Sequence, residues 1–177
     1  HPESKGVFDI DSTQLLAAAR GMNEGVDMKG QKLAGSTDFY LGAAVFPEAE
    51  PWEIQRERAI QKIEAGAFFF QTQAIMDAEK FAANAAEIAD AGAKVIAGIL
   101  LLKSGRVVDF INERLAGLMV PEDSGARIKG ASDPMAEAIA LAGEQIRTVR
   151  GVVHGIHIMP LGSDTAVPRI LEAGGLI

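Results

Sequence analysis

Four short apolar runs, each followed by a segment with helical character, constrain the fold of this chain more than any other feature. The runs lie near residues 39–46, 67–73, 94–100 and 152–159, and aromatic and β-branched residues are frequent in them. Strands that alternate with helices pair in parallel through right-handed crossovers. Their nearly continuous apolar character fits a sheet covered by helices. The sequence therefore predicts an α/β protein with a four-stranded parallel sheet.

Helix start and stop signals divide the segments between these runs. Asp11, Asp77 and Ser104 can each cap a helix, and glycines follow several of the helical segments. The predicted helices cover residues 14–25, 52–66, 77–92, 104–117, 121–130, 133–151 and 164–175. Two architectures satisfy this order. One is a small open α/β sheet, and the other is half of an eight-stranded β/α barrel, a fold that typically needs about 250 residues.

Composition excludes several classes of function. The 177 residues suffice for one domain with a core, and their formal net charge of −7 argues against nucleic acid or an anionic membrane as a partner. The chain contains no cysteine, which excludes disulfides, zinc thiolates and a thiol nucleophile and fits a cytoplasmic protein. No apolar run is long enough to span a bilayer. His154 and His157 are three residues apart on a strand and face opposite sides, so we expect no metal site there.

Polar side chains end the second apolar run, which closes on Gln71-Thr72-Gln73. In α/β folds, ligand groups gather at the carboxyl ends of parallel strands. An amide that donates and accepts hydrogen bonds suits a polar heterocycle, but Thr72 or Gln73 could equally satisfy backbone groups at the strand end. We expect one mouth of the sheet to be formed by Phe46, Glu48, Thr72, Gln73 and His157.

Several motifs occur in an order that resembles one enzyme family. They are "VFDIDSTQLL" at 7–16, "FPEAEP" at 46–51, "KIEAGAFFFQTQAIMD" at 62–77, "AGIL" at 97–100 and "GIHIMPLG" at 155–162. The set resembles the methylenetetrahydrofolate reductase family, and the resemblance runs essentially from end to end of the chain. The EAGA-FF-x-TQ element is its most specific part.

The resemblance implies a TIM-type (β/α)8 barrel that holds FAD. Such an enzyme passes a hydride from NADH or NADPH to 5,10-methylenetetrahydrofolate, as a cytoplasmic oxidoreductase of one-carbon and methionine metabolism. It also implies that residues 1–177 are a single partial domain, the second half of the barrel, with the catalytic residues in the first half. We expect this half alone to be inactive, and to form a homo-oligomer or associate with the other half. The alternatives are a non-catalytic half-barrel and a small α/β binding protein.

The resemblance also assigns residues to the substrate. Gln73 matches a glutamine that hydrogen-bonds the pterin ring of the folate. Thr72 would hold the strand end or approach the flavin, and His157 matches a position in the last strand that faces the barrel mouth. Without the resemblance, His157 could equally be a histidine bonded to a neighbouring strand.

For FAD, the resemblance implies two groups of contacts. Phe8 and Asp9 would lie beside the sugar-phosphate side and Phe46 beside adenine, where an aromatic face can stack. Lys62 would reach the diphosphate as a point charge. The turn before the next helix would supply the remaining contacts, from Glu50, Pro51 and Trp52. On residue type alone, Phe46 could be a core residue and Lys62 a solvated helix lysine.

The chain departs from the family pattern at several places that bear on ligands. On the third strand, Leu101 replaces a common proline, and no glutamine follows where some members use one for folate. Glu50 stands where the family often has a histidine. Leu161-Gly162-Ser163 stands where some members have leucine-asparagine-arginine, so the arginine that meets substrate in those members has no counterpart here.

Overall fold

The computed structural model describes residues 3, 6, 9–115 and 117–177. Its strands form one parallel sheet in the order β1-β2-β3-β4, which confirms the prediction. The strands are β1 (Gly42–Val45), β2 (Phe69–Ala74), β3 (Lys94–Leu100) and β4 (Gly155–Met159). Three of them, β1, β2 and β4, begin a little later than the apolar runs suggested.

Helices follow the strands in the predicted order. They are α1 (Ser12–Asn23), α2 (Trp52–Glu64), α3 (Ala78–Asp90), α4 (Gly105–Arg114), α5 (Glu122–Gly130), α6 (Pro134–Val149) and α7 (Val167–Gly174), with a short 3-10 turn (Asp164–Ala166) before α7. The three predicted caps are confirmed, since the side chains of Asp11, Asp77 and Ser104 each accept a hydrogen bond from the first turn of their helix. At α1 the cap is reciprocal, because Gln14 also accepts from the Asp11 backbone N–H at 2.8 Å.

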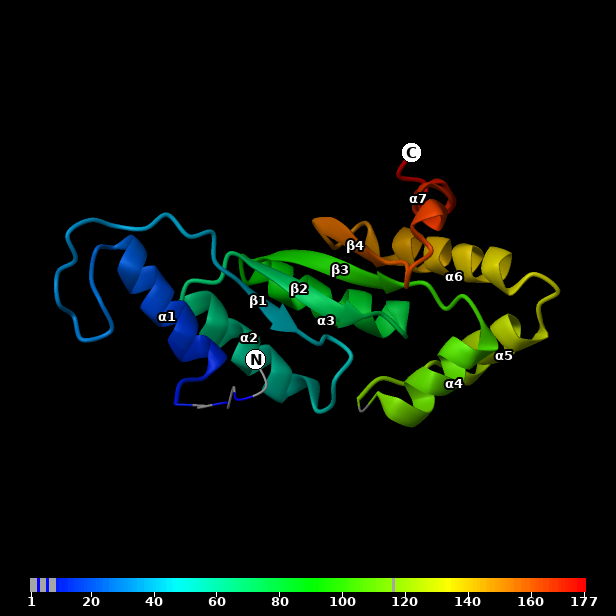
Figure 1. Cartoon of the computed structure of the whole chain (residues 1–177), viewed down its shortest axis with the longest axis horizontal. Coiled ribbons are helices and arrows are strands. Elements are labelled where there is room, and N and C mark those ends of the chain that lie inside the picture. The colour runs from blue at the N-terminus through cyan, green and yellow to red at the C-terminus, as the bar shows by residue number, and fades with distance from the viewer. Residues whose placement is uncertain (1–2, 4–5, 7–8, 116) are drawn as a thin grey trace.

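The core lies between the sheet and the helices on one of its faces. Phe70 of β2 and Val95 of β3 are fully buried there, against Phe81 of α3 and Ile146 of α6. The opposite face is exposed where Ala44, Gln71, Lys94 and His157 stand. Figure 1 shows the sheet in the middle of an elongated molecule, with α1 toward one end of the long axis and α4 and α5 toward the other.

The strand order indicates which α/β architecture this is. Consecutive strands are neighbours throughout, and each connection carries at least one helix. In a doubly wound sheet the strand order reverses at a switch point, and helices then cover both faces. An unreversed order with right-handed crossovers keeps the helices on one face, as in consecutive units of a β/α barrel. In the part of the chain that the structure describes, no helix is long and apolar enough to cross a membrane.

Candidate functional site

Thr72 joins β2 to β3 at an irregularity of the sheet. Gln71 pairs with Ile96 but Ala74 pairs with Gly98, so β2 gains one residue over β3. The Thr72 hydroxyl accepts from the Gly98 backbone N–H at 2.9 Å and donates to the Gln73 carbonyl at 2.8 Å. A Cβ at Gly98 would lie 2.7 Å from that carbonyl oxygen, so the strands approach this closely only with glycine there. The buried hydroxyl thus holds the strand end, and contact of Thr72 with a ligand stays a prediction.

Gln73 occupies the carboxyl end of β2 with its amide unengaged. The side chain is exposed, whereas its neighbours Thr72 and Ala74 are buried. Its amide takes part in none of the hydrogen bonds found among the described residues. The task of satisfying backbone groups at this strand end therefore falls to Thr72. The donor and the acceptor of the Gln73 amide remain free, and its contact with a ligand stays a prediction.

Glu48 connects the loop after β1 to the loop after β2. Its carboxylate accepts from the backbone N–H of Met76 at 2.8 Å and from that of Asp77 at 3.2 Å. Burial raises the pKa of Glu48 above its usual range, although the two N–H donors act in the opposite direction. A second contact holds the loop after β1 to the helix that follows β2, since the Asn84 amide of α3 donates to the Pro47 carbonyl at 2.6 Å. The two loops therefore form one unit.

The turn predicted to contact FAD is attached to α3. Glu50 forms an ion pair with Lys80, whose hydrogen bond holds the pKa of Glu50 below its usual range. Trp52 donates from its indole N–H to Glu87 at 3.0 Å. Pro51 is exposed, follows a cis peptide bond and directly precedes α2. The structure thus brings this turn against one helix, and Lys80 offsets the negative charge of Glu50.

Lys62 and Phe46 are two predicted cofactor residues close to β1, Phe46 directly after the strand and Lys62 in α2. The Lys62 ammonium is half-buried and donates to the Ala44 carbonyl at 2.9 Å, so Lys62 is not a fully solvated helix lysine. Burial lowers the pKa of Lys62, and the nearby charge of Arg58 adds to the effect. Phe46 is half-buried, and a Cβ at Gly117 would lie 3.9 Å from its ring.

Two of the predicted cofactor residues lie near the start of the chain. Asp9 is exposed, and Phe8 lies outside the described residues.

The histidines of the last strand have different surroundings. His157 is exposed and stands opposite Gly98 in the register of β3 and β4. His154, just before β4, accepts through Nδ1 from the Val95 backbone N–H at 3.3 Å. The bond to a neighbouring strand that sequence reasoning allowed for His157 is therefore made by His154.

Sequence reasoning missed Lys103, which connects the loops after β3 and β4. Its ammonium donates to the Leu161 carbonyl and lies 3.3 Å from the Ser163 hydroxyl oxygen. Leu161 and Gly162 both have positive φ, 51° and 77°, which gives the loop after β4 its sharp turn. The rule that drew attention to Gln73 could also have found Lys103, because Lys103 is the first charged residue after the third apolar run.

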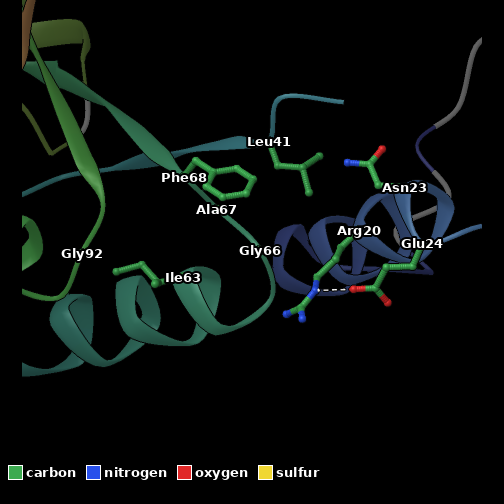
Figure 2. Close-up of a pocket in the computed structure, with 9 residues that line it drawn as sticks. All are labelled: Arg20, Asn23, Glu24, Leu41, Ile63, Gly66, Ala67, Phe68 and Gly92. Atoms are coloured by element: carbon green, nitrogen blue, oxygen red, sulfur yellow. Dashed lines mark hydrogen bonds and ion pairs between the residues drawn. The ribbon is translucent and has the colours of Figure 1, made fainter. Parts of the chain in front are cut away.

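A cavity of about 500 Å³ opens at the other end of the sheet. Figure 2 shows α1 on one side of it, with the Arg20–Glu24 ion pair, and Leu41 and Phe68 on the other. Leu41 and Phe68 precede β1 and β2, so the cavity lies at the amino ends of the strands. β/α barrels bind their ligands at the carboxyl ends. We therefore place the candidate functional site at the carboxyl ends of the strands, where Gln73 lies near the end of β2 and Glu48 and Lys103 lie in the loops after β1 and β3.

Comparison with known proteins agrees with this architecture. A family model described as methylenetetrahydrofolate reductase matches residues 26–175, most of the chain. "Methylenetetrahydrofolate reductase 2" of Schizosaccharomyces pombe is 27% identical in an alignment 164 residues long, and the match covers 78% of this chain and 25% of that relative. The chain thus spans about a quarter of the length of that curated relative. On the extent of the family match and the strand order, the chain belongs to the methylenetetrahydrofolate reductase family, and its four β/α units are those of a TIM-type barrel.

Proposed function

We propose that the protein containing these β/α units reduces 5,10-methylenetetrahydrofolate to 5-methyltetrahydrofolate, with FAD as cofactor and NAD(P)H as reductant. Family membership supports the reaction class. The observation that carries the proposal is the exposed, unengaged amide of Gln73 at the carboxyl end of β2, within the motif most specific to the family. Cytoplasmic localisation and NADH or NADPH as the reductant belong to the same proposal.

The residues of this chain fit a flavin dinucleotide at the loop after β1. Lys62 offers an ammonium whose hydrogen-bond partner is a neutral carbonyl, so an N–H remains for a phosphate oxygen. Phe46 offers a half-buried aromatic ring for adenine. The Glu50–Lys80 ion pair removes a free negative charge from the same loop, and Trp52 anchors it to α3. Bound FAD would supply hydride transfer between nicotinamide and folate.

Gln73 binds and orients the folate in this proposal. Its amide can donate to one atom and accept from another along the edge of a pterin ring. The hydrogen bonds of Thr72 hold the backbone at this point, so the amide starts from a defined position. His157, exposed on β4 with β3 between it and the strand of Gln73, is the second substrate residue that we propose.

Separate measurement of the two half-reactions by stopped flow tests this function in the complete protein. We expect Gln73→Ala to weaken the folate half-reaction by about 1–3 kcal/mol, because a buried pterin group loses its partner. Flavin reduction by NAD(P)H should change little, since nicotinamide offers no pterin to the amide. Gln71→Ala is the matched control, an exposed glutamine on the same strand but farther from its end.

Three outcomes would count against this assignment. Equal losses in both half-reactions would mean that Gln73 shapes the flavin pocket in general. No loss in either would remove Gln73 from the substrate site. A wild-type flavoprotein that is not reoxidised by methylenetetrahydrofolate would overturn the proposed function itself.

A further inference from the structure

Lys103 is the only lysine or arginine in the four loops that follow the strands. These loops cover residues 46–51, 75–77, 101–104 and 160–163, and their acidic residues are Glu48, Glu50 and Asp77. Each of these acids has a partner: Glu48 binds two backbone N–H groups, Glu50 binds Lys80, and Asp77 caps α3. Lys103 therefore supplies the only positive side-chain charge of these four loops, all of which lie within the described residues.

The partners of Lys103 are neutral oxygens. Its ammonium donates to the Leu161 carbonyl and to the Ser163 hydroxyl, and the residue is half-buried. In the described part of the chain it belongs to none of the ion pairs, unlike Lys80 or Lys129. An ammonium carries three N–H donors, so one is left after these two contacts. Its positive charge is thus held in place without a close carboxylate, in a protein of net charge −7.

Such a cation favours an anionic ligand group. Partial burial weakens the screening of its charge, and an N–H that meets a carboxylate or phosphate forms a stronger hydrogen bond than one between neutral groups. The two neutral contacts also restrict the side chain before a ligand arrives, which lowers the entropy lost on binding. The position at the carboxyl ends of β3 and β4 is where β/α barrels bind their ligands.

We propose that Lys103 recognises an anionic oxygen, carboxylate or phosphate, of the ligand bound at the carboxyl end of the sheet. The inference rests on the proposed function and adds to it a determinant of ligand specificity. Within that function two sources supply the oxygen: the glutamate tail of a folate and the diphosphate of a dinucleotide. Lys103 binds the tail or the diphosphate, while Gln73 binds the pterin.

Lys103 also joins two loops, and a purely structural role must be distinguished from ligand recognition. Lys103→Gln removes the charge but keeps an N–H donor, and Lys103→Arg keeps the charge. Ser163→Ala removes one loop contact and leaves the charge in place. Lys129→Gln is the matched control for charge, because Lys129 lies on α5 and pairs with Asp109 of α4.

Two-dimensional NMR of the ¹⁵N-labelled 18.7 kDa chain provides the test, because it detects weak binding residue by residue. The probes are inorganic pyrophosphate and two matched pairs: folic acid against 6-methylpterin, and FAD against riboflavin. We expect the three anionic probes to shift backbone amides of residues 101–105 and 161–163. Lys103→Gln should weaken their binding about tenfold, the loss expected for one charge-assisted hydrogen bond. Binding of the two neutral probes should change little in Lys103→Gln. Binding of the anionic probes should change little in Lys103→Arg, Ser163→Ala and Lys129→Gln.

The paired probes separate the possible results. Loss of the preference for folic acid over 6-methylpterin assigns the tail carboxylates to Lys103, and loss of the preference for FAD over riboflavin assigns the diphosphate. Equal weakening of charged and neutral probes, or no shift of these amides by any anion, overturns the proposal for Lys103. Shifts by pyrophosphate that depend on Lys103, with no binding of pterin or flavin, would support Lys103 as an anion site and overturn its assignment to a folate tail or a dinucleotide diphosphate.

Discussion

Single side chains that bind backbone groups of distant loops organise the carboxyl end of the sheet. Glu48 binds the N–H groups of Met76 and Asp77, and Thr72 binds the N–H of Gly98. Gln145 of α6 adds a third such contact, donating to the Ile75 carbonyl at 3.0 Å. These contacts satisfy backbone groups around β2 without the Gln73 amide, which is exposed and free to make other hydrogen bonds.

The pH dependence of stability should report the environment of Glu48. Its folded-state pKa is raised above the ordinary 4.5, mainly by burial. The stability that this residue contributes is therefore fully present below pH 4.5 and is lost as the pH rises through the raised value. Denaturant unfolding of wild type and Glu48→Gln from acid to neutral pH measures this effect. The free energy of unfolding of wild type, relative to that of Glu48→Gln, should fall as the pH rises.

Glu50 supplies a control of opposite sign. Lys80 lowers the folded-state pKa of this exposed carboxylate, so its contribution is present above the ordinary value and lost as the pH falls through the lowered one. The free energy of unfolding of wild type, relative to that of Glu50→Gln, should therefore increase as the pH rises. Parallel pH profiles for the two variants would contradict the burial of Glu48.

Among the elements, α6 and α7 make an unusually close contact. A Cβ at Gly143 of α6 would lie 2.6 Å from the Cβ of Ala173 and 2.8 Å from its carbonyl oxygen. A Cβ at Gly174 of α7 would lie 2.6 Å from Cγ2 of Ile146. Glycines on both helices thus allow the closing helix to dock on α6, and Arg147 adds a hydrogen bond to the Ala173 carbonyl.

Gly143→Ala should destabilise the protein although it improves helix propensity. Alanine gains about 0.5–1 kcal/mol over glycine inside a helix, but the overlap with the α7 backbone costs about 1–3 kcal/mol, so the net change is a loss. Gly130→Ala is the matched control, because Gly130 ends α5 and a Cβ there meets nothing within 4 Å. Guanidinium unfolding measures both variants. A gain of stability in Gly143→Ala would show that α7 does not pack this closely.

At the scale of the molecule, the sheet presents two edges and one exposed face. Within the described residues, β1 pairs with β2 alone and β4 with β3 alone. Parallel sheets are almost always covered on both faces, and an unpaired edge offers backbone groups to another chain. Association, with another copy or with further β/α units, is therefore a proposal that follows from the topology.

Sedimentation velocity over a range of concentrations tests association of the 177-residue chain. We expect self-association that Ala44→Lys weakens, because Ala44 is an exposed position on the edge strand β1 and a charge there opposes pairing. Ala83→Lys places the same charge on an exposed position of α3 and should have little effect. A chain that stays monomeric throughout, or equal effects of the two substitutions, would contradict the proposal.

The elements and their order were determined by the sequence itself. Apolar runs, helical spacing and caps such as Asp11 and Asp77 act between residues a few positions apart, so they can be read along the chain. The four parallel strands and the seven α-helices of the described residues follow from these signals. The position of Gln73 at the carboxyl end of β2 follows as well, because the direction of the strand determines which residues lie at that end.

Only the tertiary structure decided which polar side chains bind backbone groups and which keep a donor or an acceptor free. Thr72 meets the backbone of a residue 26 positions away, Glu48 one 28 positions away and Lys103 one 58 positions away. Local patterns carry no information about such partners, so Thr72 and Gln73 looked alike in the sequence, and Lys103 went unnoticed. A buried polar group must find a hydrogen-bond partner wherever the packing of strands and loops supplies one, and that packing exists only in the folded chain.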